Sequence, residues 1–121
     1  MNIEQYRNYC INKKGVTEHF PFDDDVLVFK VMGKMFALSS LKKWEEGTPS
    51  VNLKCDPDRA LELRAQYEAV QPGYHMNKNQ WNTVSINQEL TDIIIFELID
   101  HSYDLIVAGL TKKLQAELKN L

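Results

Sequence analysis

Two runs of β-forming residues, at 26–31 and 34–39, stand on either side of the dipeptide Met32-Gly33. Such runs around a short turn that contains glycine predict a β-hairpin. Side chains alternate between the two faces of a strand, so the first run divides into two sets: Leu27, Phe29 and Val31 on one face, and Val26, Val28 and Lys30 on the other. The hairpin commits this part of the chain to antiparallel pairing.

Helical patterns occur before and after the hairpin. Apolar residues recur at helical spacing over 3–14, and Gly15 follows as a stop signal. Asp56-Pro57 is a strong helix start, because Asp caps the first turn and Pro suits the first helical position. We therefore predict helices at 3–14, 57–67 and 89–108, with a short final helix from Thr111.

The remaining segments are predicted to be strands and loops. Residues 19–22 suit a short extended segment, 40–50 a loop, and 51–55 an alternating strand. A second hairpin is expected between 69 and 86, with its tip at Met76 to Asn79. This order of elements predicts an α+β two-layer sandwich, with an antiparallel sheet of about five strands and helices on one face.

Ten apolar side chains from these elements are expected to form the core. They are Leu27, Phe29, Phe36, Val51, Leu53, Val84, Ile95, Leu98, Ile99 and Ile106. At 121 residues the chain suits a single domain over 1–121. No apolar run of 18 residues or more occurs, so we expect no membrane span.

The charged and sulfur-containing residues limit the classes of function. Net charge is −3, which argues against a dedicated nucleic-acid binder. Residues 26–84, however, hold eight basic and six acidic side chains, an excess of +2. Cys10 and Cys55 are too few and too far apart for a zinc site, and the N-terminus is polar. Two free thiols and a cytoplasmic location are therefore expected.

Three features resemble a metal site or a reactive thiol, and for each of them a purely structural role is favoured. The row Glu97, Asp100, His101 and Asp104 shares one face of the long helix, which we expect to face water. Asp23-Asp24-Asp25 has no EF-hand spacing and reads as a solvated turn. Cys55 precedes a helix, where a small apolar role is favoured over a reactive thiol. We expect no metal, no cofactor and no catalytic residues.

Residues 72–84, PGYHMNKNQWNTV, hold more hydrogen-bond donors and aromatic rings than packing requires. This stretch and several others resemble the MmcQ/YjbR family of small bacterial proteins. The matching segments cover nearly the whole chain: HFPF at 19–22, VFKV at 28–31, GKMFA at 33–37, LKCDP at 53–57, and LIDHSYDLIVAGL at 98–110. The resemblance implies a two-layer sandwich, similar to secretion-chaperone-like folds, and DNA binding through a double wing of two hairpins. It implies no catalytic residue set.

The first hypothesis for function is DNA binding, with Met32-Gly33 and Met76 to Asn79 as the wings. Lysines would contact phosphates and the polar and aromatic side chains would reach bases or stack. The candidate site residues are Lys30, Lys34, Lys54, His75, Asn77, Lys78, Trp81 and Asn82. The alternative for each residue is a solvated sheet face, with Trp81 and Tyr74 closing the edge of the core.

Two other functions are open from the sequence alone. An exposed sheet face suits a protein or peptide partner, and the net charge of −3 fits this better than DNA. A small enzyme or ligand-binding protein is the third hypothesis, although no nucleophile with its base and no phosphate loop is visible. We expect a monomer or a weak dimer.

Overall fold

The hairpin predicted around Met32-Gly33 is present in the computed structural model, which describes residues 1–121. Its arms are β2 (Val26–Val31) and β3 (Lys34–Ser40). Met32 and Gly33 have φ of 49° and 85°, and positive φ at both central residues is the turn that suits hairpin twist. A bulge opposite the Phe29–Lys30 step lets Phe36 and Ala37 both enter the core.

The sheet has six antiparallel strands in the order β1-β2-β3-β4-β6-β5. The other four are β1 (Val16–His19), β4 (Ser50–Lys54), β5 (Val70–Pro72) and β6 (Trp81–Ser85). The extended segment expected at 19–22 lies earlier in the chain, because β1 pairs with β2 only as far as His19. Beyond it, Pro21 has no backbone N–H to donate to a strand partner.

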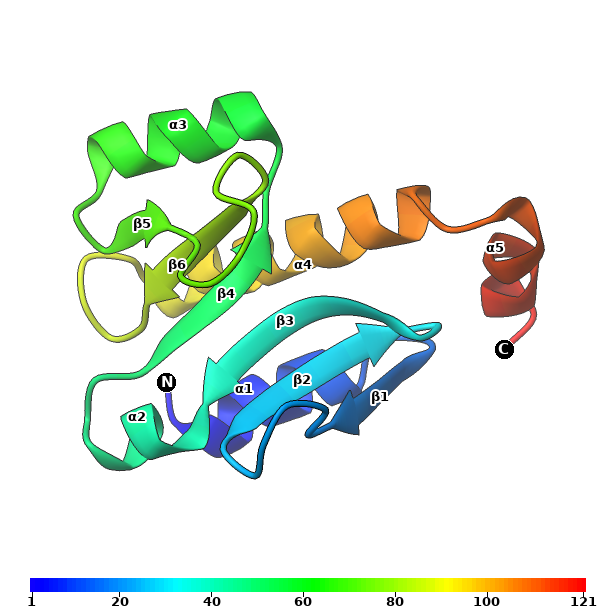
Figure 1. Cartoon of the computed structure of the whole chain (residues 1–121), viewed down its shortest axis with the longest axis horizontal. Helices are drawn as coiled ribbons and strands as arrows, with labels where there is room; N and C mark the ends of the chain where they lie inside the picture. Colours follow the sequence, from blue (N-terminus) through cyan, green and yellow to red (C-terminus); the bar gives the residue numbers. More distant parts are fainter.

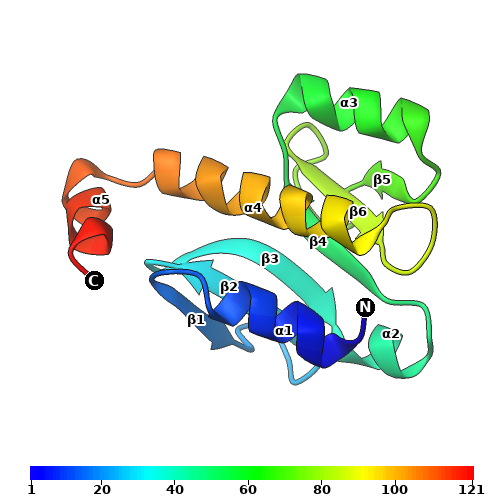
Figure 2. The ribbon, with the colours of Figure 1, turned by 180° about the vertical axis from the view of Figure 1, so that it is seen from behind.

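Two helices cover one face of the sheet, as Figure 2 shows from behind. These are α1 (Ile3–Ile11) and α4 (Asp92–Ala108). Tyr6 of α1 meets Phe29 edge to face at a ring-centroid distance of 5.7 Å. Nine of the ten predicted core side chains are buried, and Ile106 is partly buried against the others. The predicted α+β two-layer sandwich is confirmed.

Three further helices lie around the sheet (Figure 1). The helix α3 (Pro57–Gln66) flanks the β5 edge, and α5 (Lys112–Lys119) lies beyond the end of α4. The helix α2 (Leu41–Glu45) occupies the segment predicted to be a loop. It forms because the Ser40 side chain accepts from the Lys43 N–H as a cap, and because Trp44 stacks on Tyr6 at 5.5 Å.

Two helix boundaries differ from the predictions. The first helix ends at Ile11 rather than residue 14, with Asn12 as its cap. The long helix begins at Asp92 rather than residue 89, because the Thr91 side chain accepts from the Ile94 N–H there. No helix of the structure combines the length and the apolar character that crossing a membrane requires.

The acidic row of α4 does not face water as a whole, contrary to the prediction. Asp100 accepts from the Tyr9 hydroxyl at 2.7 Å and pairs with Lys13, which fastens α4 to α1. His101 Nε2 accepts from the Asp56 N–H at 3.1 Å. Glu97 pairs with Arg59 of α3 at 2.9 Å. Helical spacing placed these side chains on one face, but neighbouring helices of the fold supply partners to three of them.

Candidate functional site

The sheet face opposite α1 and α4, here called the outer face, is not covered by a helix (Figure 1). A small apolar cluster of Val28, Leu38 and Trp81 lies on it. Trp81 is only 8% exposed, so the ring is packed rather than presented. The outer face therefore has a fixed apolar patch, and Met76 of the loop 73–80 packs against it.

One cross-strand row organises the outer face. Val28 lies opposite Leu38, Leu38 opposite Asn52, and Asn52 opposite Thr83. The Thr83 hydroxyl donates to Asn52 Oδ1 at 2.6 Å, and a pair of polar side chains across strands stabilises the sheet. The row runs from apolar residues in β2 and β3 to polar ones in β4 and β6.

Arg64 of α3 forms hydrogen bonds that hold the loop 73–80, which connects β5 and β6. Arg64 Nε donates to Asn82 Oδ1 at 2.7 Å, and its Nη2 donates to the carbonyls of Trp81, at 3.1 Å, and Lys78. Asn82 is 2% exposed. Burial leaves neither Trp81 nor Asn82 free to contact a ligand in this structure. Both act on the loop, not as the base-reading residues that the sequence suggested.

Glycine is required at position 73, at the start of this loop, because the backbone there lies very close to Trp81. A Cβ at this position would lie 2.8 Å from the Trp81 Cβ and 2.9 Å from its carbonyl oxygen. The Gly73 N–H donates to that carbonyl at 2.8 Å. Because φ of Gly73 is not positive, the missing side chain, and not an unusual backbone, is what the position needs.

The same loop presents two aromatic rings to solvent. Tyr74 is 69% exposed, and its ring centroid lies 4.0 Å from that of His75. The Tyr74 N–H donates to Thr83 Oγ1 at 3.0 Å, and its carbonyl accepts from Asn52 Nδ2 at 3.2 Å. His75 adopts φ of 59°, which is uncommon for a residue with a side chain. Two partly buried side chains, Asn52 and Thr83, thus fix an exposed loop that is strained at His75.

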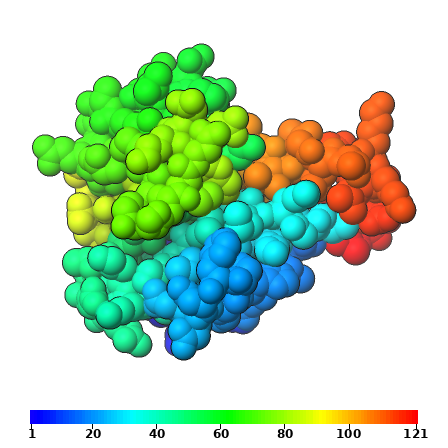
Figure 3. Space-filling model, viewed as in Figure 1, coloured from blue at the N-terminus to red at the C-terminus, as the bar shows by residue number.

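A groove of about 760 Å³ separates this loop from the loop 20–25. In Figure 3 the yellow-green loop and the blue segment rise on the two sides of it. Tyr74, His75 and Met76 line one side, Phe22 and Asp23 the other, and Lys43 of α2 lies at its end. Its size falls within the range of small-ligand sites, about 300–1,000 Å³.

Three of the four predicted lysines, Lys30, Lys54 and Lys78, lie on the outer face or in the loop 73–80. Lys30 and Lys54 follow Val28 and Asn52 on the outer face, and Lys54 lies opposite Trp81. Lys78 is exposed in the loop 73–80. Lys34 is exposed too, but it lies opposite Val31 of the main core, so it belongs to the other face of the sheet and not to the outer face. None of the four ammonium groups forms an ion pair within the chain. Asn77 is exposed, but its Oδ1 accepts from the Asn79 N–H.

The first of the two predicted wings is not a free loop. The Met32 N–H donates to the Gly15 carbonyl at 3.1 Å, and the Met32 side chain packs against the main core. Only Gly33 and Lys34 are exposed at this turn. Gly15, just before β1, leaves room for these contacts, because a Cβ there would lie 3.2 Å from the Met32 sulfur and 2.6 Å from Leu118 of α5. Sequence pattern alone gave no sign of this contact.

Phe22, Lys43 and Arg64 belong to the site but were not predicted. Phe22 ends a segment predicted to be extended, Lys43 falls in a predicted loop, and Arg64 is one charged residue on an amphipathic helix. Their roles depend on segments far apart in the sequence. Alternation over the predicted strand 51–55 places Asn52 on the face opposite Val51 and Leu53, and this was a signal for the outer face that the sequence did offer.

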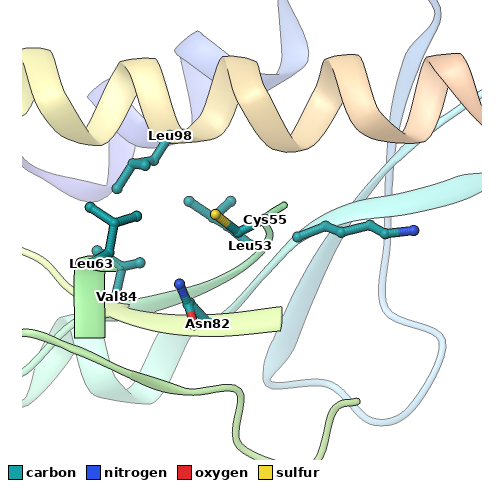
Figure 4. Close-up of a pocket in the computed structure, with 7 residues that line it drawn as sticks. Leu53, Cys55, Leu63, Asn82, Val84 and Leu98 are labelled. Carbon is teal, nitrogen blue, oxygen red and sulfur yellow. The ribbon is translucent and has the colours of Figure 1, made fainter. Parts of the chain in front are cut away.

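A second hollow lies between the sheet and α4, lined by Leu53, Cys55, Leu63, Asn82, Val84 and Leu98 (Figure 4). Its volume of about 10 Å³ is at the lower limit for one water molecule. Burial raises the pKa of Cys55, and raises that of Cys10 to about 12. Both thiols are packed as small apolar groups. No three His, Cys, Asp or Glu side chains are grouped to hold a metal ion.

The sequence pattern of the YjbR family matches residues 11–105. The chain belongs to the YjbR family. The family match includes the whole sheet and the loop 73–80, and ends before α5. The resemblance seen in the sequence is thereby confirmed.

Relatives support the same membership. The chain is 39% identical to the uncharacterised protein YbdF of Escherichia coli O157:H7 over 100 residues, 83% of this chain and 80% of that protein. It is 36% identical to the uncharacterised protein YjbR of Escherichia coli K12 over 103 residues, 85% of each.

Solved structures of the family share this architecture. The crystal structure of Deinococcus radiodurans protein DR2400, with domain DUF419, superposes with a TM-score of 0.89 at 35% identity, covering 98% of this chain and 88% of that one. A Pseudomonas syringae protein, target PsR293, gives a TM-score of 0.73 at 29% identity, covering 87% and 98%.

Proposed function

We propose that this YjbR-family protein binds nucleic acid through the outer face of its sheet. The observation that carries the proposal is the set of Lys30, Lys54 and Lys78, which lie on or beside an uncovered surface and have no internal ion-pair partner. Unpaired ammonium groups are free to neutralise phosphates and release counterions. Binding by so few cations on a protein of net charge −3 is expected to be weak and strongly salt-dependent.

A salt titration tests this function. Fluorescence anisotropy of a labelled oligonucleotide is measured against protein at several salt concentrations. Three phosphate contacts predict a slope of log K against log salt of about −2 to −3, since each contributes roughly −0.7 to −0.9. Lys78→Ala is expected to reduce the slope by about one unit for every sequence.

The matched control is Lys112→Ala on α5, which lies at the opposite end of the molecule from the loop 73–80 (Figure 1). It should leave the slope unchanged. If folded wild-type protein gives no anisotropy change with single-stranded or duplex DNA at low salt, the nucleic-acid function is rejected.

A second candidate function, binding of a peptide segment, is favoured by the apolar rims of the groove. Phe22 and Tyr74 are 64% and 69% exposed on its two sides, and exposed aromatic rings are frequent anchors of protein interfaces. A peptide selected from a displayed random library would show weak salt dependence. Its affinity would fall in Phe22→Ser and not in Lys78→Ala, the reverse of the nucleic-acid expectation.

A further inference from the structure

We propose that the groove receives unpaired bases, so that the nucleic acid bound by this protein is single-stranded. This inference rests on the function proposed above and names its substrate class. Proteins that hold single strands combine cations along the backbone path with aromatic rings on which bases stack. The outer face has both, because unpaired lysines and the exposed rings of Phe22 and Tyr74 occupy the same side of the sheet.

The backbone of Tyr74 is held in place, so its exposed ring offers a surface on which a base can stack. Its backbone N–H and carbonyl are both fixed, by Thr83 Oγ1 at 3.0 Å and Asn52 Nδ2 at 3.2 Å. Those two side chains are joined to each other at 2.6 Å. The ring and its hydroxyl form no hydrogen bond within the chain, and the His75 ring supports it at 4.0 Å. Because the backbone beneath the ring is already fixed, stacking of a base needs to order only the Tyr74 side chain.

Phe22 faces the groove from the opposite loop. That loop is fixed by Asp23, whose Oδ1 accepts from the N–H groups of Asp25 at 2.9 Å and Val26 at 2.8 Å. One oxygen of the Asp23 carboxylate is therefore occupied by backbone donors. Lys43 lies in the same groove and makes no ion pair, so a phosphate next to a stacked base has a cation within the site.

The polar groups of the groove floor are already paired with one another. Ser39 Oγ donates to the Ser50 carbonyl at 2.6 Å and accepts from Trp44 Nε1 at 2.8 Å. Asn52 and Thr83 are paired as described above. Because these groups are occupied, they do not read base edges. The groove is expected to favour stacking over sequence recognition, which is the behaviour of single-strand binders.

Duplex DNA fits this surface less well. In a duplex each base is stacked between its neighbours, so its face is not available to Tyr74 or Phe22. The β2–β3 turn, which would have to enter a groove of the duplex as a wing, is tied down through Met32.

The test compares single-stranded and duplex binding in variants of Tyr74. The probes are a labelled oligodeoxythymidylate of about 16 nucleotides and a labelled duplex of equal length. Tyr74→Ala should weaken single-strand binding roughly 5- to 150-fold and leave duplex binding within about twofold. Tyr74→Phe should retain single-strand binding, because stacking needs the ring and not the hydroxyl. Since Tyr74 is anchored through its backbone, both variants are expected to fold, which circular dichroism verifies.

The possible outcomes separate this inference from the function on which it rests. Equal losses on both probes, or no loss in Tyr74→Ala while Lys78→Ala still lowers the salt slope, would overturn the single-strand inference and keep nucleic-acid binding. Absence of binding to either probe would remove both. Binding of a selected peptide that is lost in Tyr74→Ala, without nucleic-acid binding, would assign the groove to a protein partner instead.

Discussion

Arg64 Nε donates a hydrogen bond of 2.7 Å to Oδ1 of Asn82, a side chain that is 2% exposed. The same guanidinium reaches the carbonyls of Trp81 and Lys78. One side chain of α3 therefore satisfies acceptors at both the buried end of β6 and the exposed loop before it. This contact links the packing of the sheet to the shape of the candidate site.

Arg64→Ala should lower the free energy of unfolding by about 2–3 kcal/mol, because it leaves a buried acceptor without its charged donor. Amides of the loop 73–80 should also exchange faster with solvent. Urea denaturation and hydrogen exchange measure the two effects. Arg59→Ala on the same helix is the control, since its pair with the 64%-exposed Glu97 is a surface contact expected to contribute at most about 1 kcal/mol. Equal losses in both variants would contradict this account.

Trp81→Ala should destabilise the protein by about 3–5 kcal/mol, because it removes a large buried ring from the cluster with Val28 and Leu38. Trp81→Phe keeps an aromatic ring and should lose clearly less. Chemical denaturation gives both values. A Trp81→Ala protein as stable as wild type, with weakened nucleic-acid binding, would show that the ring acts on the ligand and not in packing.

Tyr6→Phe should raise stability by about 1 kcal/mol. The Tyr6 side chain is fully buried, and its hydroxyl has no hydrogen-bond partner. Burial, followed by the neighbouring Cys10 thiol, raises the pKa of Tyr6 well above its usual value, so the hydroxyl stays neutral. Because a thiol is at most a weak hydrogen-bond partner, Tyr6→Phe removes a buried polar group that has little to compensate its lost hydration. Tyr9→Phe is the matched control on the same helix. It should be destabilising, because the Tyr9 hydroxyl donates to Asp100. Thermal denaturation of the two variants should therefore shift in opposite directions.

Stability should fall as pH decreases through the range where an unfolded histidine gains its proton, about 6.5. Partial burial, followed by the nearby Arg59 guanidinium, lowers the pKa of His101 in the folded state. The unfolded chain then binds a proton before the folded one does, which favours unfolding at lower pH. Protonation also removes the Nε2 lone pair that accepts from the Asp56 N–H. In urea titrations across this range, His101→Gln should show a flatter pH dependence than wild type.

The secondary structure and the sheet faces follow largely from local residue patterns. The hairpin around Met32-Gly33 followed from two β-forming runs on either side of a glycine, and alternation correctly separated Leu27 and Phe29 from Val28 on the two faces of the sheet. The start of α3 at Asp56-Pro57 could be predicted from the capping residue alone, since the Asp56 side chain accepts from the Arg59 N–H. Such features depend on residues a few positions apart, and the sequence shows those directly.

Which residues of the site are buried was decided only by the tertiary structure. The motif at 72–84 contains Tyr74 and Trp81, both aromatic, yet one is 69% exposed and the other 8%. Alternation assigns a side chain to a face, but it does not say what else rests on that face. Trp81 is buried because it packs against Val28 and Leu38, which come from strands some 40 to 50 residues earlier in the chain. Tyr74 is exposed because Asn52 and Thr83 hold its backbone at the surface. Contacts between distant segments, which no local pattern records, made one ring structural and left the other available for binding.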